Sequence, residues 1–109
     1  MALHLPKTIE LFMASENVHD TDAIADCFAS DATVIDEGRR RAGLNEISAW
    51  RRETEAKYHH TLTPLAITQC AGKTVVETDM SGDFPGSPVT VEFVFQLKDD
   101  KIASLEIAA

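Results

Sequence analysis

Cysteine is scarce in this chain: only Cys27 and Cys70 occur among its 109 residues, far apart in the sequence. Neither belongs to a Cys-x-x-Cys pair, which excludes the usual zinc and dithiol redox motifs. The four histidines show neither His-x-His nor His-x-x-x-His spacing, so we expect no metal site. Both cysteines are expected to pack as small hydrophobes in a reducing compartment.

Positive charge and long apolar runs are also lacking. Ten Lys and Arg residues stand against 18 Asp and Glu residues, which gives a formal net charge of -8. A phosphate backbone or an anionic membrane would be repelled, so neither nucleic acid nor a membrane is an expected partner. No stretch approaches the roughly 20 apolar residues of a membrane span, and we expect no leader segment, because no charged segment followed by a long apolar run is present. We expect a soluble, cytoplasmic protein.

Sequence motifs for common enzyme chemistry are missing as well. Nothing resembles a Ser-His-Asp nucleophile, a phosphate-binding loop or a dinucleotide fingerprint, and no cofactor is expected. What the chain does have is a hydrophobic share of 44%, enough for a core in one domain over residues 1–109. The first half has helical periodicity and the second half strand periodicity. The predicted fold class is therefore α+β, with helices on one side of a largely antiparallel sheet.

Three helices are expected in the first half. Pro6 suits the first turn of a helix whose stripe of Ile9, Phe12, Met13 and Glu16 ends near residues 17–20. Asp20 or Thr21 can cap a second, short helix, which Ser30 and Asp31 are expected to end. After a turn over residues 38–43, a third helix is predicted over residues 44–58. Its inward face would carry Ile47, Trp50, Thr54 and Tyr58, with Arg51 and the other charged residues mostly elsewhere.

Four strands are expected in the second half, over residues 60–70, 74–80, 89–97 and 102–107. Short connections make consecutive strands antiparallel neighbours. The strand at 89–97 alternates most clearly, with Val91 and Phe93 among the residues of its inward face. Its other face is mixed, since Val94 interrupts a polar set. That face would either pair with a second subunit or be exposed to solvent.

Asp36 is the most informative residue of the chain. It ends the apolar run Ala32-Thr33-Val34-Ile35 and, by strand alternation, shares a face with Val34. A carboxylate in that place is either desolvated, with a raised pKa that suits proton transfer, or it is solvated at the strand end. In the second case it accepts hydrogen bonds from the following turn or pairs with Arg39 or Arg41. The arginines at 39–41 themselves form either a solvated turn or an anion site.

Residues 28–36, Phe-Ala-Ser-Asp-Ala-Thr-Val-Ile-Asp, followed by Gly43, Ile47 and the aromatic Trp50, resemble the nuclear transport factor two-like superfamily. The closest likeness is to the SnoaL-like polyketide cyclases and the ketosteroid isomerases. The resemblance implies a cone in which a strongly curved, mostly antiparallel sheet wraps a long helix, with two N-terminal helices, around an apolar pocket. It also implies a small hydrophobic ligand and a homodimer formed through the outer face of the sheet.

The resemblance makes Asp36 the counterpart of the carboxylate that moves a proton in the ketosteroid isomerases. Their oxyanion hole uses a tyrosine and a protonated aspartic acid, and the matching positions here are Phe12 and Val91. The loss of one such donor costs on the order of a hundredfold to a thousandfold in rate. Steroid isomerisation by that mechanism is therefore not expected.

Two hypotheses remain for function. In the first, a cofactor-free isomerase, cyclase or hydrolase acts beside a carbonyl or epoxide, with Asp36 and His60 as an acid/base pair. The predicted pocket lining comprises Phe12, Trp50, Tyr58, Val91 and Phe93. In the second, the same fold serves as a non-catalytic ligand-binding or subunit-association module. His60 is then a junction residue, and most of these apolar side chains simply fill the core.

Overall fold

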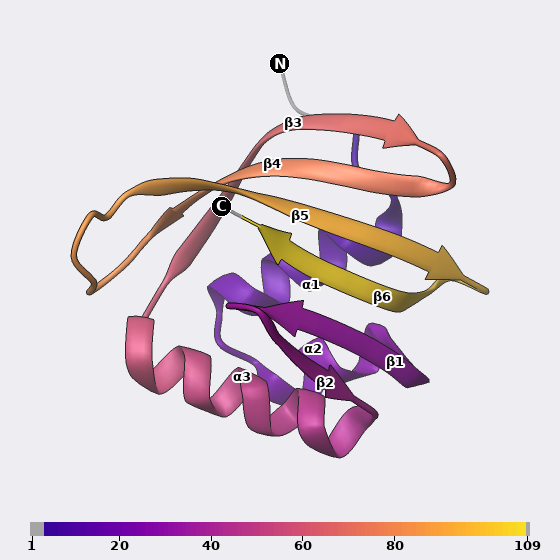
Figure 1. Cartoon of the computed structure of the whole chain (residues 1–109), viewed down its shortest axis with the longest axis horizontal. Coiled ribbons are helices and arrows are strands. Elements are labelled where there is room, and N and C mark those ends of the chain that lie inside the picture. Colours follow the sequence, from indigo (N-terminus) through magenta and orange to yellow (C-terminus); the bar gives the residue numbers. More distant parts are fainter. Residues whose placement is uncertain (1–3, 109) are drawn as a thin grey trace.

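Three helices and six strands form the structure (Figure 1). The computed structural model describes residues 4–108, and the side chains of Lys57 and Tyr58 lie outside the described part. The helices are α1 (Lys7–Asn17), α2 (Thr21–Asp26) and α3 (Leu44–Tyr58). The strands are β1 (Phe28–Asp36), β2 (Arg39–Ala42), β3 (Thr61–Cys70), β4 (Lys73–Ser81), β5 (Val89–Lys98) and β6 (Lys101–Ala108). The predicted α+β class is confirmed.

All six strands belong to one sheet, in the order β2-β1-β6-β5-β4-β3. Within residues 4–108 only the β1–β6 pairing is parallel, and β2, α3 and the β3–β5 meander connect these two strands along the chain. Extra residues interrupt the register in β1, β3 and β6, and such bulges bend and twist a sheet. Pro64 lies beside the irregularity in edge strand β3, where a missing backbone donor is tolerated.

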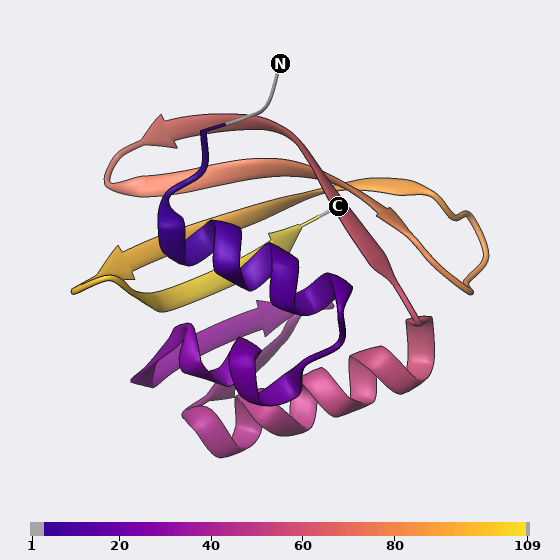
Figure 2. The same ribbon diagram turned by 180° about the vertical axis from the view of Figure 1, so that it is seen from behind.

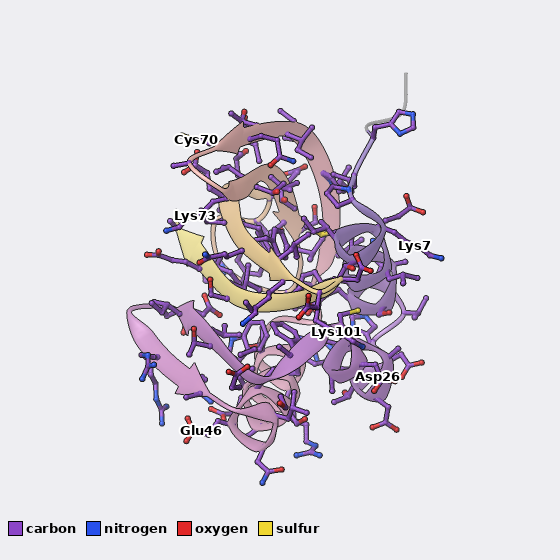
Figure 3. The ribbon with its side chains drawn as sticks, turned by 90° about the vertical axis from the view of Figure 1, so that its right-hand side faces the viewer. Lys7, Asp26, Glu46, Cys70, Lys73 and Lys101 are labelled. Carbon is purple, nitrogen blue, oxygen red and sulfur yellow. The ribbon has the colours of Figure 1, made fainter. Side chains whose placement is uncertain are left out.

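The helices cover one side of the curved sheet. Figure 2 shows α1 and α2 in front of the sheet, while α3 runs along its lower edge beneath β1 and β2. The edge-on view in Figure 3 shows the sheet curling around this side. Four buried aromatic rings join the layers, with Phe12 of α1 in contact with Phe28, Phe93 and Phe95. The cone of the predicted family fold is therefore present, and the sheet stays unclosed.

Several local predictions are confirmed. Asp20 caps α2, because its carboxylate accepts a hydrogen bond of 3.1 Å from the Ala23 backbone. The third helix occupies the predicted residues and follows Gly43, whose φ of 84° suits glycine. Glu46 in its first turn accepts a hydrogen bond of 2.8 Å from the backbone nitrogen of Ala42, which ties α3 to β2.

Two predictions about the region between α2 and α3 are wrong. Ser30 and Asp31 do not end α2, which stops at Asp26; they lie inside β1, which is longer than the short strand expected. The turn predicted over residues 38–43 is limited to Glu37 and Gly38, with φ of 55° and 73°. Positive φ at both central residues is typical of a two-residue hairpin, so the arginine run forms β2 and pairs with β1. Pairing outweighed the weak strand propensity of that run.

The periphery of the fold is polar. Figure 3 labels Lys101 of β6 near Asp26, whose backbone oxygen accepts a hydrogen bond from the lysine ammonium group. Cys70 lies at the exposed β3–β4 hairpin and Cys27 is buried, and both are free thiols. Only Cys27 therefore packs as predicted. No helix within residues 4–108 is long and apolar enough to cross a membrane.

Candidate functional site

A cavity of about 240 Å³ lies on the helix-covered side of the sheet. Its polar wall comes from the helices, the end of β1 and the start of the meander. Its apolar wall comes from β4, β5, β6 and the loop between β4 and β5. The polar residues are Glu16, Asp36, Glu37, Arg51, Thr54 and His60, and the others are Trp50, Met80, Phe84, Val89, Val91, Phe93 and Ile107. The cavity therefore combines an apolar body with a few converging polar groups, as ligand sites do.

Asp36 stands at the end of β1, partly buried in this cavity wall. The indole nitrogen of Trp50 donates a hydrogen bond of 2.9 Å to its Oδ2 atom. This bond joins β1 to α3 and fixes the direction of the carboxyl group. Asp36 lies two residues after buried Val34, so both side chains are on the same face of β1. The carboxyl group of Asp36 therefore points to the helix-covered side of the sheet.

Burial raises the pKa of Asp36 above its ordinary value, because the charged form loses water. The hydrogen bond from Trp50 lowers it again, the nearby Glu37 carboxylate raises it, and a backbone hydrogen bond at Glu37 lowers it. Among residues 4–108, neither Arg39 nor Arg41 forms an ion pair with Asp36. Asp36 thus shares features of both alternatives: it is partly buried with a raised pKa, it accepts a hydrogen bond from the following turn, and it has no arginine partner among the described residues.

Arg41 has another partner. Its two terminal nitrogens lie 3.2 and 3.3 Å from the carboxylate oxygens of Glu53, one turn further along α3 than Trp50. This hydrogen-bonded pairing holds the pKa of Glu53 below its usual value. The pair borders a second, more polar cavity of about 220 Å³, which Asp36 and Trp50 also line. Asp36 therefore lies where an apolar and a polar cavity adjoin.

Three charged or titratable side chains form a buried cluster beside the first cavity. Glu16, Arg51 and His60 are 2%, 1% and 2% exposed. Glu16 Oε1 lies 2.8 Å from His60 Nε2, and Glu16 Oε2 lies 3.0 Å from Arg51 Nε. Buried charges are rare unless paired. Here the Glu16 carboxylate contacts both Arg51 of α3 and His60 at the start of the meander.

His60 lies on the inward face with Leu62, as its strand spacing predicted. Because an ionised Glu16 can only accept, the hydrogen bond places the proton of a neutral His60 on Nε2 and leaves Nδ1 as a bare acceptor. Nδ1 has no hydrogen-bond partner in the described part of the chain. His60 and Asp36 line the same cavity, and a positive His60 would lower the pKa of Asp36. Asp36 and His60, the predicted acid/base pair, therefore line one cavity, and no hydrogen bond joins them in the described part of the chain.

The predicted pocket lining divides into three groups. Trp50, Val91 and Phe93 line the cavity. Phe12 does not; it is fully buried in the aromatic core, and the residue of α1 that lines the cavity is Glu16. The side chain of Tyr58 lies outside the described residues. Whether the lining residues bind a ligand stays a prediction.

Glu16 and Arg51 are the site residues that the sequence reasoning missed as such. Glu16 carried a signal, because it falls in the same helical stripe as Ile9, Phe12 and Met13, and a charged residue on an apolar face is unusual. Arg51 carried none, since it is one of several charged residues in α3, and the prediction that it lies away from the buried face is wrong. No cluster of metal-ligating side chains occurs among the residues described.

Comparisons with known proteins agree with this architecture. Residues 9–105 match the model of the SnoaL-like domain. The crystal structure of a candidate polyketide cyclase from Sinorhizobium meliloti is 39% identical, covers 94% of each chain and superposes with a TM-score of 0.91. A protein of ketosteroid isomerase-like fold from Catenulispora acidiphila, in complex with trimethylamine, is 20% identical over 97% of this chain and 87% of that one, with a TM-score of 0.84.

An NTF2-like protein from Cytophaga hutchinsonii shares the fold at 13% identity, over 98% of this chain and 90% of that one, with a TM-score of 0.76. No curated protein matches the chain. The predicted resemblance to this superfamily and to its SnoaL-like group is confirmed.

Proposed function

The chain is a member of the SnoaL-like family, and from this premise we propose that it binds a small hydrophobic molecule in the cavity at Asp36 and moves a proton on it. The carrying observation is the Asp36 carboxyl itself. It lies in a largely apolar cavity, its direction is fixed by Trp50, and burial raises its pKa. A carboxyl in such surroundings is suited to general acid/base catalysis, because its pKa is displaced toward the working pH.

The size and shape of the cavity limit the ligand. About 240 Å³ exceeds the space of a few water molecules, at ~30 Å³ each, and is smaller than the ~300–1,000 Å³ of drug-sized ligand pockets. One compact ring system fits such a volume. The proposed reaction is proton transfer at a carbon beside a carbonyl, or to the oxygen of an epoxide, in an isomerase, cyclase or hydrolase that needs no cofactor.

Proton transfer can be measured before the natural substrate is known. Cyclohexanone incubated with the protein in D₂O exchanges the protons next to its carbonyl, and NMR follows the loss of their signal. We expect exchange above the buffer rate for the wild type and the buffer rate for Asp36→Asn. Asp31→Asn is the matched control, because Asp31 lies on the same strand and is exposed. Equal acceleration by wild type and Asp36→Asn would rule out Asp36 as the proton carrier.

Ligand binding has its own test. Mass spectrometry of the protein as purified, in native and denaturing solvent, should find a bound small molecule that is released on unfolding. A mass equal to that of the bare chain, together with no binding of cyclic probes, would contradict a ligand-binding role.

A second candidate function is ligand binding without chemistry. It is favoured by Phe12 and Val91, because both positions that match the isomerase oxyanion donors carry buried apolar side chains. A co-purified ligand combined with no proton exchange in any variant would favour this candidate.

A further inference from the structure

Arg51 is an unusual component of an apolar cavity wall. Its guanidinium group lies in the middle of α3 with only 1% of the side chain exposed, and it lines the cavity beside Asp36. The Nη1 and Nη2 atoms have no hydrogen-bond acceptor among the residues that the structure describes. Buried donors without acceptors are rare in folded proteins and cost free energy, so these two groups need an explanation.

The neighbours of Arg51 neutralise its charge without using these donors. Glu16 faces Nε at 3.0 Å, at a distance that makes an ion pair but without hydrogen-bond alignment. The other oxygen of Glu16 is bound to His60. The Trp50 ring lies 5.7 Å from the guanidinium carbon, within the range of a cation–π contact. Glu16 and Trp50 therefore contact Arg51, while Nη1 and Nη2 have no acceptor in the described part of the chain.

We propose that Nη1 and Nη2 of Arg51 bind an acceptor oxygen of the ligand, so that the ligand is an apolar molecule carrying a carbonyl or carboxylate group. This inference rests on the proposed function, since it assigns a polar handle to the same ligand. Nη1 and Nη2 have almost no accessible surface, so the ligand oxygen reaches them only after the Arg51 side chain shifts toward the cavity that it lines. The planar fork matches either oxygen group.

Charge distinguishes the two sources of that oxygen. Glu16 already balances Arg51, Glu37 lines the same cavity, and the chain carries a net charge of -8. A carboxylate would therefore meet more repulsion than a neutral carbonyl, and the carbonyl is favoured. Nη1 and Nη2 of Arg51 would also stabilise negative charge that develops on the ligand oxygen during proton transfer. They would thus act as the oxyanion donors that Phe12 and Val91 cannot supply.

The test compares two probes of nearly equal shape, cyclohexanone and methylenecyclohexane, which differ in C=O against C=CH₂. Trp50 is the single tryptophan and lines the cavity, so its fluorescence reports binding. We expect the wild type to bind the ketone on the order of tenfold more tightly, because hydrogen bonds to charged groups are strong. The Arg51→Met variant should lose this preference, because a carbonyl that leaves water for a site without a donor loses its hydrogen bonds. Arg52→Met, an exposed neighbour on the same helix, should keep the preference.

A second variant guards against loss of folding. Arg51→Met alone leaves Glu16 buried without a counter-charge, whereas Glu16→Gln with Arg51→Met removes both charges and keeps an acceptor for His60. Loss of the ketone preference in this double variant supports the proposal. Cyclohexanecarboxylate bound more tightly than the ketone, with that binding lost in the same variants, would assign the contact to an anion.

Three outcomes would overturn the proposal. Equal binding of ketone and alkene by the wild type would refute the Arg51 contact while leaving ligand binding intact. A preference that survives in the double variant would assign the oxygen to another donor. Failure of every probe to bind the wild type would instead count against the proposed function, and the Arg51 contact would fall with it.

Discussion

Removal of the Glu16 carboxylate is the perturbation with the clearest expected effect on stability. Glu16→Ala takes away the counter-charge of Arg51 and the hydrogen-bond partner of His60 in one step. All three side chains are at most 3% exposed, so water cannot replace the lost partner without opening the core. An uncompensated guanidinium group would remain in the interior.

The magnitude follows from that burial. Breaking a buried ion pair from one side costs about 3–5 kcal/mol, against a total stability of about 5–15 kcal/mol for a domain of this kind. With a urea slope of about 2 kcal/mol per molar, the unfolding midpoint should fall by roughly 1.5–2.5 M. Glu16→Gln with Arg51→Met should recover most of this loss, because no unpaired charge remains.

Urea unfolding followed by Trp50 fluorescence and by circular dichroism measures the effect. Glu53→Ala is the matched control, because the side chain of Glu53 pairs with Arg41 and is 58% exposed. Its midpoint should shift by only a small fraction of the Glu16→Ala shift, since solvent screens an exposed pair. Similar midpoint shifts for the two variants would mean that the Glu16–Arg51 pair is not buried, and the reasoning would be refuted.

Two further predictions concern pH and assembly. Burial raises the pKa of Asp36 above its ordinary value of 3.8. The folded protein therefore binds the carboxyl proton of Asp36 more tightly than the unfolded chain does. Its stability accordingly falls as the pH rises from 3.8 through the folded pKa. Asp36→Asn should therefore become more stable relative to wild type across that window in urea melts; a difference independent of pH would contradict this. We also expect a homodimer through the outer sheet face, where Val94 of β5 lies opposite Val75 and Glu106. Val94→Arg should then give a monomer in sedimentation experiments, and an unchanged sedimentation coefficient would exclude this face as the interface.

Much of the fold could be predicted from periodicity. The alternation of Val91, Phe93 and Phe95 specified both β5 and its buried face, and these residues are at most 8% exposed. Side-chain spacing also located α3. The failures lie at Ser30, Asp31 and the arginine run, where local propensity favours turns. Pairing with β1 imposes a strand on the arginine run, whereas Ser30 and Asp31 lie in the irregular stretch of β1 between its β6 pairs at Phe28 and Thr33.

The site was only partly predictable. Asp36 could be identified because a strand end with one buried face constrains where a carboxyl points. Burial of Glu16 was visible as a charge within an apolar stripe. Burial of Arg51 was not visible, because charged residues in a surface helix are ordinary and only the position of α1 gives this one a partner.

By itself, the sequence determined the fold class, the family and the presence of a carboxyl at the end of β1, because hydrophobic periodicity and local motifs are written in neighbouring residues. Only the tertiary structure decided that this carboxyl is bound by Trp50 rather than by an arginine, and that Arg51 lies inside with Glu16. The physical reason is that the environment of a charge depends on partners from distant elements. Those partners come together only when the sheet has curved around the helices.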